Sequence, residues 1–470
     1  MEQLVLEKLA DLNNLKFIKN LEFAKKINEI KLLLISKTTN KNFLFAGLIT
    51  LFGLVIRLIN ISNPTSYIFD ETYYIKDAKH IITSGAEEGF FVHPELGKIL
   101  IGLPMRIGGL DNTFCWRLSA VIFGTVCIAL TIVAAKKMLN SWVFANFAGF
   151  LMCIDGVEIV LSRVSLLDIF VTTFVLSAFI FLLYNKPIGL GIFSGLAMSV
   201  KWSALWFIIV FVIYYFLVNR QTIFQHFNAN KLINLKKNII QKNFLRPLGQ
   251  LSILPILIYI FNWLPYLIYR PELQNKSIFQ RLYILMDFHK QIYNFHANLT
   301  STHSYQSAAW QWIPMARPTA MYYNGAYSNG RVCEIISLGN LFIWWGGGIA
   351  LFFLIFSWLN RNLRTKIELK KIGLLLFSVA AGILPWLILY KRITFQFYAI
   401  IILPFIVICL TNVLHYLLST NIISKRKIIS YLTIIAIISL TISIYFYPVW
   451  SGLPITYDHW KNIMFFQNWI

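Results

Sequence analysis

Residues 43–80 read FLFAGLITLFGLVIRLINISNPTSYIFDETYYIKDAKH, an apolar segment followed by two adjacent carboxylates. The apolar part is close to the roughly twenty residues that an α-helix needs to cross a membrane. Asp70 and Glu71 follow it by about ten residues. The stretch that starts at Glu71, ETYYIKDAKHII, predicts a helix lying along the membrane. Adjacent helical residues point about 100° apart, so we expect one carboxylate to face a substrate and the other to hold the loop or a partner. The alternative is an ordinary helix N-terminus, where acidic side chains favour the helix dipole.

The composition excludes a water-soluble fold. Of the 470 residues, 57% are hydrophobic and only 13% are charged, and the mean hydropathy is positive. The spanning segments are helices, because lipid-exposed strands would need to close into a barrel. The five cysteines have no CxxC spacing, and we read most of them as buried apolar residues that form neither a zinc site nor a disulfide frame. They are Cys115, Cys127, Cys153, Cys333 and Cys409.

The fold class predicted from the apolar windows is an all-α polytopic membrane protein with about eleven transmembrane helices. Two long loops, 61–113 and 267–339, separate groups of spans and are rich in aromatic residues, so we expect them to form the working part of the protein. The predicted spans are 43–60, 114–135, 141–161, 165–184, 187–200, 202–219, 247–266, 340–358, 372–390, 394–417 and 428–447.

The distribution of charge predicts how the chain is oriented. With the N-terminus in the cytoplasm, the segments predicted inside carry about 25 Lys and Arg against 6 acids, and the rest of the chain about 17 against 14. The net charge of +22 is therefore mostly a positive-inside signal, and nucleic-acid binding loses its main support. The predicted organisation is a basic cytoplasmic segment (1–42), a transmembrane domain (43–450) and an extracytoplasmic tail (451–470), with both long loops outside.

Charged residues within the predicted spans mark candidate functional positions, because such charges are costly in a membrane. Five of them map to the outer half of the spans, on the side that carries Asp70 and Glu71. They are Arg57, Arg117, Arg163, Asp168 and Lys201. Snorkelling of the side chain towards the membrane surface could explain any one of them.

The two long loops carry a second group of candidates. The first loop contains His93, followed by Pro94. The second contains three histidines, two tryptophans and an arginine: His289, His296, His303, Trp310, Trp312 and Arg317. The histidines are seven residues apart and lack the close ligand pairs of zinc sites, so we predict no metal-ligand set.

Seven motifs together resemble the protein O-mannosyltransferases, a family of C-type membrane glycosyltransferases. They cover most of the chain from 43 to about 350, in the order expected of that family. The second loop is too short for the soluble repeat module of eukaryotic members, so the chain resembles a bacterial member. The motifs are FDETYYIKDA, HPELGKILIG, WRLSAVIFG, SRVSLLD, GLAMSVKWSALW, DFHKQIYNFHANLTSTHSYQSAAWQWIPMARP and SLGNLFIWWGG.

The resemblance implies transfer of mannose from a dolichyl- or polyprenyl-phosphate donor to Ser or Thr hydroxyls of secreted or membrane proteins, with inversion. Asp70 would be the catalytic base, and Glu71 would position the acceptor or a basic neighbour. The resemblance also implies an active site on the extracytoplasmic face of the cell membrane. The sequence leaves open whether a divalent cation, Mg or Mn, helps to hold the phosphate, and whether the enzyme forms a dimer.

The remaining candidates take roles from the same resemblance. The donor phosphate would be bound by three basic residues, Arg57, Arg117 and Lys201, whose charge suits a departing phosphate. Arg163 and Asp168 would form either a structural pair or part of the site. The seven loop residues named above, from His93 to Arg317, would shape the groove for the acceptor.

Two other functions compete with this one. A relative that glycosylates a lipid or cell-wall polymer, such as an aminoarabinose transferase acting on lipid A, would have a similar first loop; the segment HSYQSAAWQW favours protein mannosylation by resemblance. A transporter would also have many spans, but we would expect repeat symmetry and charges near the midplane. The charges here gather near one face.

Overall fold

The structure is a computed structural model that describes residues 41–87, 89, 92–224, 244–299, 302–327, 330–360, 366–419 and 423–470. The contacts divide the chain between Phe45 and Ala46, and the second unit, Ala46–Ile470, is compact. The basic segment predicted at 1–42 lies outside the described residues, except for its last two positions. The second unit contains all of the candidate site residues.

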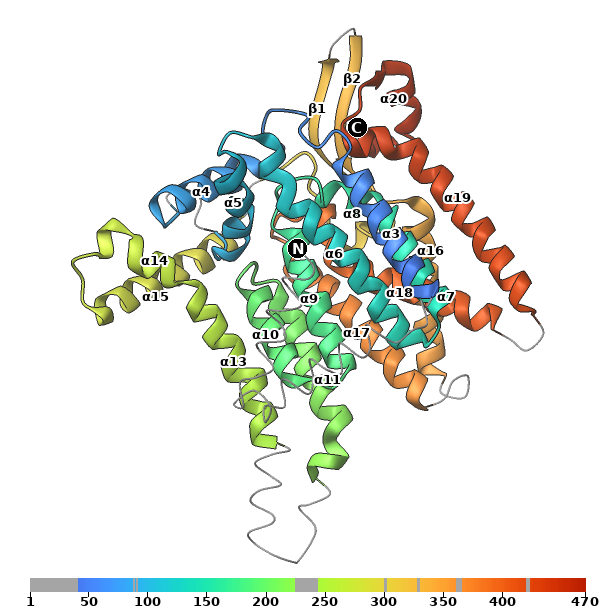
Figure 1. The fold of residues 1–470 in the computed structure, drawn as a ribbon, viewed down its shortest axis with the longest axis horizontal. Helices are drawn as coiled ribbons and strands as arrows, with labels where there is room; N and C mark the ends of the chain where they lie inside the picture. Colours follow the sequence, from blue (N-terminus) through green and yellow to red (C-terminus); the bar gives the residue numbers. More distant parts are fainter. Residues whose placement is uncertain are drawn as a thin grey trace, which may run out of the picture. The chain divides into compact units, whose positions relative to one another are not determined.

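The prediction of a helical multi-span protein is confirmed. Within the described residues, eight segments are long and apolar enough to cross a membrane. Each of the eleven predicted spans contains a helix, and eight of them coincide with these segments (Figure 1). The eight are formed by α3 (Lys41–Leu58), α6 (Thr113–Leu139), α11 (Ala204–Phe224), α13 and α14 (Arg246–Asn262 and Leu264–Tyr269), α16 (Leu341–Leu359), α17 (Lys366–Ile388), η7 and α18 (Gln396–Ile402 and Leu403–Leu418) and α19 (Lys425–Ser451).

The other three predicted spans contain the shorter apolar helices α7 (Trp142–Cys153), α9 (Asp168–Leu183) and α10 (Pro187–Met198). Nearly every residue of α9 is buried, because it packs against α6 on one side and α10 on the other. A helix of this length suits the protein interior better than the lipid phase. The apolar core of the second unit therefore lies around α9.

The span predicted at 141–161 is broken at Asp155, which separates α7 from α8 (Gly156–Leu161). One carboxylate oxygen of Asp155 caps α8 by accepting from the backbone of Val157 and Glu158. The other oxygen accepts from the backbone N–H of Asn340 at 3.0 Å and from Trp344 Nε1 at 2.9 Å. The motif SLGNLFIWWGG therefore joins the start of α16 to the start of α8.

The long loops and the C-terminal segment form smaller elements at the end of the bundle where the chain's C-terminus lies (Figure 1). A three-stranded antiparallel sheet, in the order β1-β2-β3, was not expected in an all-α fold; its strands are β1 (Thr319–Tyr327), β2 (Arg331–Ser337) and β3 (Ile455–Thr456). The helices are α4 (Glu71–Ser84), α5 (Leu96–Gly108), η3 (Pro271–Leu273), α15 (Ile278–Ala297), η4 (Ala309–Gln311), α20 (Tyr457–Ile463) and η8 (Gln467–Trp469).

The termini of several long helices meet beside α4 and α5 at this end. The backbone N–H of Leu96, at the start of α5, donates to the carbonyl of Ser199 just after α10, at 3.3 Å. The hydroxyl of Thr113, at the start of α6, donates to the carbonyl of Ser62 at 3.1 Å. The first long loop is thereby fixed over the helix ends that carry the predicted site residues.

Candidate active site

Asp70 and Glu71 are adjacent in sequence but have opposite surroundings. Glu71 is fully buried and accepts hydrogen bonds from the backbone N–H groups of Ile68 and Ser165, both at 2.9 Å. Arg117 donates two more, from Nε at 2.9 Å and from Nη2 at 3.0 Å. Asp70 is the N-cap residue of α4 without a capping hydrogen bond, and no described residue donates one to its partly exposed carboxylate. A catalytic role for Glu71 does not fit its saturated carboxylate; holding a basic neighbour does.

The backbone before Asp70 is strained. Phe69 has a φ of 50°, a left-handed conformation that costs a residue other than glycine about 1–2 kcal/mol. Its ring packs edge-on against Phe395 and Phe397, with centroid distances of 5.5 and 5.6 Å, and against His303 at 5.9 Å. These aromatic contacts hold the turn that presents Asp70, and they place His303 beside it.

The surroundings of Asp70 make it a stronger base than an ordinary aspartate. The pKa of Asp70 is raised to about 6 as the net result of three effects: desolvation raises it most, the charge of Lys201 lowers it, and the charge of Asp168 raises it. A carboxyl group with this pKa is mostly ionised at neutral pH and can accept a proton. Asp70 therefore has the ionisation state that a general base requires.

Arg117 holds the chain segment that leads to Asp70. Its guanidinium group donates to the carbonyls of Ile61 at 2.8 Å, Pro64 at 3.0 Å and Ser66 at 3.2 Å, besides its two bonds to Glu71. The side chain is buried. All of its bonding capacity is spent on protein acceptors, so Arg117 fixes the loop after α3.

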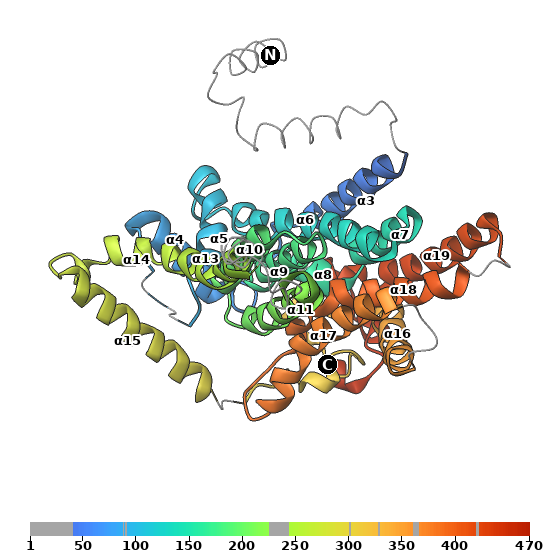
Figure 2. The same cartoon turned by 90° about the horizontal axis from the view of Figure 1, so that it is seen from below.

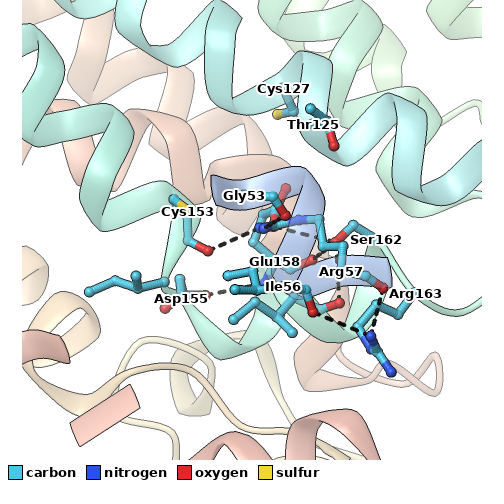
Figure 3. Close-up of polar contacts among 12 residues, drawn as sticks. Gly53, Ile56, Arg57, Thr125, Cys127, Cys153, Asp155, Glu158, Ser162 and Arg163 are labelled. Carbon is cyan, nitrogen blue, oxygen red and sulfur yellow. Dashed lines mark hydrogen bonds and ion pairs between the residues drawn. The ribbon is translucent and has the colours of Figure 1, made fainter. Parts of the chain in front are cut away.

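Arg57 and Arg163 form a second buried network at the end of α3 (Figure 3). Arg57 is fully buried, pairs with Glu158, and donates to the carbonyls of Gly53 at 2.8 Å and Cys153 at 3.2 Å. Arg163 donates to the carbonyl of Arg57 itself at 2.6 Å. We call Arg57, Arg117 and Arg163, with the carboxylates of Glu71 and Glu158, the arginine cluster.

These positions correct two interpretations of the sequence. A phosphate-binding role does not fit Arg117, because all of its N–H groups donate to protein acceptors. It does not fit Arg57 either, because this side chain is fully buried against Glu158 and two backbone carbonyls and does not line the cavity described below, although its Nε has no hydrogen-bond partner among the described residues. Arg163 and Asp168 do not pair with each other. Arg163 also donates to the carbonyl of Ser451 at 3.2 Å, whereas Asp168 pairs with Lys201.

Lys201 and Asp168 form an ion pair at the start of α9. The ammonium group of Lys201 lies 2.9 Å from both carboxylate oxygens of Asp168 and 5.0 Å from the ring centroid of Tyr398. An ammonium group has three N–H donors, and two of them are used here. Lys201 therefore keeps one donor and its charge for a ligand.

This ion pair lies at one end of a cavity of about 650 Å³, which we call the Lys201 cavity. The polar end is lined by His93, Asp168, Lys201, His296, Arg392 and Tyr398. The other end is apolar and consists largely of side chains of α11 and α17 that are exposed on the surface of these spans. They include Leu205, Trp206, Ile209 and Ile388, with Leu389 just beyond α17.

Arg392 is a site residue that the sequence analysis missed. Its Nη2 donates to Nδ1 of His296 at 2.9 Å, and its guanidinium group lies 5.1 Å from the ring centroid of Trp386. The Nε and Nη1 atoms are buried and have no hydrogen-bond partner among the residues that the structure describes. In the sequence, Lys391 and Arg392 lie in a short connection between two predicted spans, on the side predicted to be outside. Two adjacent basic residues on the outside depart from the positive-inside trend, and this departure could have indicated a functional role for Arg392.

His296 orients Arg392. Its Nε2 lies 2.7 Å from the carbonyl of Val92, so the ring proton is on Nε2 and Nδ1 accepts from Arg392. Burial and the charge of Arg392 lower the pKa of His296 to about 4, which keeps the ring neutral. His93 lines the same cavity, and its ring centroid is 5.1 Å from that of His296.

The other predicted loop residues are dispersed. His289 lies against Trp202 in a cluster between α13 and α15. Its Nδ1 donates to the carbonyl of Leu285 at 2.7 Å, so its Nε2 accepts from the hydroxyl of Tyr259 at 2.8 Å. Trp312 is buried in the core, whereas Trp310 is exposed. Arg317 donates to the carbonyls of Ser304 and Ile470. In the part of the chain that the structure describes, no three His, Cys, Asp or Glu residues are placed to hold a metal ion.

The sequence matches two family models. One, described as dolichyl-phosphate-mannose-protein mannosyltransferase, matches residues 47–269. The other, described as the C-terminal four-transmembrane region of protein O-mannosyltransferase, matches residues 281–469. The chain is 26% identical to a polyprenol-phosphate-mannose–protein mannosyltransferase of Corynebacterium glutamicum, over 90% of this chain and 92% of that protein.

Two solved structures have the same fold. The protein O-mannosyltransferase Pmt1-Pmt2 complex of Saccharomyces cerevisiae, bound to the sugar donor, aligns with a TM-score of 0.76 and 14% identity over 93% of both chains. ArnT of Cupriavidus metallidurans bound to undecaprenyl phosphate aligns with a TM-score of 0.52 and 13% identity, over 88% of this chain and 74% of that chain. The predicted C-type glycosyltransferase fold is confirmed.

Proposed function

Because this chain belongs to the protein O-mannosyltransferase family, we propose how its residues carry out the activity of that family, the transfer of mannose from polyprenol-phosphate-mannose to proteins. The observation that carries the proposal is the carboxylate of Asp70, which accepts no hydrogen bond from a described residue and is electrostatically coupled to Lys201, a residue that lines the cavity. The two family models favour this activity over a transferase acting on lipid A and over a transporter.

The donor lipid occupies the Lys201 cavity. Its phosphate lies between Lys201, which keeps one N–H donor, and Arg392, whose Nε and Nη1 have no partner in the described part of the chain. Charge-assisted hydrogen bonds of this kind are the strongest that a protein offers a phosphate. The polyprenyl chain lies along the apolar end, where Trp206, Ile209 and Ile388 are exposed on the surface of the spans.

Asp70 is the catalytic base. As the oxygen of an acceptor Ser or Thr attacks the anomeric carbon of mannose, the hydroxyl proton passes to the carboxylate of Asp70. The bond between the anomeric carbon and the phosphate oxygen breaks, the bonding electrons leave with the polyprenyl phosphate, and the configuration is inverted. The polyprenyl phosphate leaves without protonation, so one carboxylate is enough, in contrast to the pair used by glycosidases. Glu71 keeps the turn in place through Arg117.

The acceptor reaches Asp70 from the side of the long loops, where Phe69, His303 and Phe395 form an aromatic surface. We assign this side to the outer face of the cell membrane, because the segments on the opposite side carry most of the excess of Lys and Arg. The acceptors are then proteins that have crossed or entered the membrane. Dimer formation stays a prediction.

The test measures transfer of labelled mannose from polyprenyl-phosphate-mannose to a Ser/Thr-rich peptide, using purified wild-type protein and Asp70→Asn. Removing a general base typically lowers the rate by about 10²–10⁴-fold. Asp111→Asn is the matched control, because this aspartate is exposed and pairs only with Lys79 at the surface. Equal transfer by wild type and Asp70→Asn would overturn the assignment of the base. Transfer only from an aminoarabinose donor to a lipid would overturn the assignment of the substrates.

A further inference from the structure

Helix α15 has three distinct faces. One face, containing Leu285, Phe288 and Ile292, is buried against α13 and α14; Phe288 lies 5.5 Å from the ring of Trp263. A second face is polar and exposed and contains Gln280, Asp287, Gln291 and Asn294. The third face is apolar but exposed: Phe279, Tyr283, Met286 and Tyr293 are 81%, 73%, 72% and 64% exposed.

The exposed apolar residues recur at intervals of four, three and seven, so they lie in one stripe along the helix. The polar residues recur at seven, four and three and lie beside this stripe. One exposed charge, Lys290, falls within the stripe between Met286 and Tyr293, and a long lysine side chain can extend from an apolar surface to the lipid head groups. Scattered apolar residues on a surface need no explanation, but a continuous stripe of aromatic and methionine side chains marks an interaction surface. The question is which partner covers it.

We propose that the stripe Phe279–Tyr283–Met286–Tyr293 docks α15 on the membrane surface, with these side chains in the boundary between head groups and acyl chains. The first argument is continuity. α15 follows the span α13–α14, whose Phe261 and Ile268 are 71% and 52% exposed and must face lipid in a protein of this kind. The lipid-facing surface of that span therefore leads directly to the stripe.

The second argument is the direction of the helix. α15 lies across the end of α13 in Figure 1, and Figure 2, taken after a quarter turn, still shows α15 at nearly its full length. A helix with separate apolar and polar faces that runs across the spans has the geometry of an interfacial membrane helix. Tyrosine suits such a position, because it has an apolar ring and a polar tip.

The docking bears on the reaction because α15 also forms a wall of the Lys201 cavity. Tyr293, His296 and Ala297, near its C-terminal end, line the cavity, and His296 orients Arg392. The helix that rests on the membrane is thus the one that positions the phosphate-binding arginine. This consequence rests on the proposed function, whereas the docking itself does not.

The docking can be measured without an activity assay. The five native cysteines are buried, so a single cysteine introduced as Tyr283→Cys or Gln291→Cys can be labelled with an NBD maleimide in the full-length protein in liposomes. We expect brominated phospholipids to quench the probe at 283, and aqueous iodide to quench the matched probe at 291. Iodide quenching at both positions would overturn the proposal. So would lipid quenching at both, or a probe at 283 shielded from both quenchers, which would mean that a protein covers the stripe.

A second measurement tests the consequence for the donor. The double variant Tyr283→Ser with Met286→Ser should raise the KM for polyprenyl-phosphate-mannose several-fold in liposomes, and leave the KM for the peptide acceptor unchanged. Gln291→Ser on the polar face is the control, with both constants unchanged. An unchanged donor KM in the double variant, together with lipid quenching at 283, would remove the link to the cavity and leave the docking standing.

Discussion

The arginine cluster and the Lys201 cavity both contain buried cations. Among the described residues, the buried N–H groups of the cluster bind protein acceptors, apart from the Nε of Arg57, which does not line the cavity, whereas the cavity contains a cation with two unused nitrogen atoms. In the arginine cluster, Arg117 makes hydrogen bonds to three carbonyls and to both oxygens of Glu71. In the Lys201 cavity, Arg392 makes one hydrogen bond to His296, and two of its buried nitrogen atoms have no partner among the described residues.

The difference separates structural charges from functional ones. A buried charge whose donors are all bonded to protein has nothing left for a ligand, and removing it exposes its partner to an apolar interior. A buried charge with unused donors is costly for the folded protein and is retained where a ligand supplies the missing bonds. Glu71 and Asp70 show the same contrast for two adjacent carboxylates.

The largest expected effect on stability is that of Arg117→Met. It leaves the buried carboxylate of Glu71 without its ion pair and should lower the free energy of unfolding by about 3–5 kcal/mol. Thermal unfolding of the purified protein in detergent measures this. Arg106→Met, at an exposed position of α5, is the control and should change stability by less than about 0.5 kcal/mol. If Arg117→Met were as stable as the wild type, the arginine cluster would not have the structural role that distinguishes it here from the Lys201 cavity.

Arg392→Gln should differ from Arg117→Met by causing little loss of stability and a large loss of transfer activity. Two charge-assisted hydrogen bonds to the phosphate would be lost or weakened, at about 1.5–3 kcal/mol each, so kcat/KM for the donor should fall at least about 10-fold. Steady-state kinetics at varied donor concentration measure this change in kcat/KM. Arg426→Gln, at the start of α19, is an exposed control. A wild-type donor KM in Arg392→Gln would contradict the phosphate site.

The pH dependence of kcat/KM tests whether Asp70 is the carboxylate that acts as the base. Asp70 acts as a base only when ionised, and its pKa is raised to about 6, so kcat/KM should be constant above neutral pH and fall about tenfold per unit below pH 6. His296 should add no midpoint near neutral pH, because its pKa is lowered to about 4. A profile that stays flat down to pH 5 would show that the base has an ordinary carboxyl pKa or that it is another group.

His296→Phe should have the smallest of these effects. It keeps a ring of similar size but removes the acceptor for Arg392 and the donor to Val92, each worth about 1 kcal/mol. The donor KM should rise roughly fivefold, with kcat nearly unchanged. His459→Phe, on α20, is the control. An effect as large as that of Arg392→Gln would mean that His296 itself contacts the substrate.

Much of the fold was predictable because it depends on local composition. Each predicted span contains a helix, and the acidic pair at 70–71 does begin a helix. The sheet was not predicted, because its two long strands lie in a loop that we expected only to fold onto the outer face, and β3 comes from the C-terminal segment. β2 is buried at every position after Arg331, so it lacks the alternation of buried and exposed residues that marks a strand in a sequence, and β3 has only two residues.

The site was less predictable because partners far apart in the sequence decide it. Arg117 and Lys201 look equivalent as single charges in apolar segments. One meets Glu71 across 46 residues, and the other meets Asp168 across 33. Arg392 has an ordinary position beside a span, and only its contact with His296, 96 residues away, makes it part of the cavity. Spacing along a helix cannot reveal such pairs.

The arginine cluster also sets an order for biosynthesis. The carbonyls at the end of α3 are bound by Arg163, and the loop after α3 is bound by Arg117, so neither is fastened when the ribosome has made only the first span. Arg163 in turn binds the carbonyl of Ser451, at the end of the last long helix. The nascent chain therefore inserts its first helix long before that helix has its final partners, and the turn bearing Asp70 is completed only when later spans have entered the membrane.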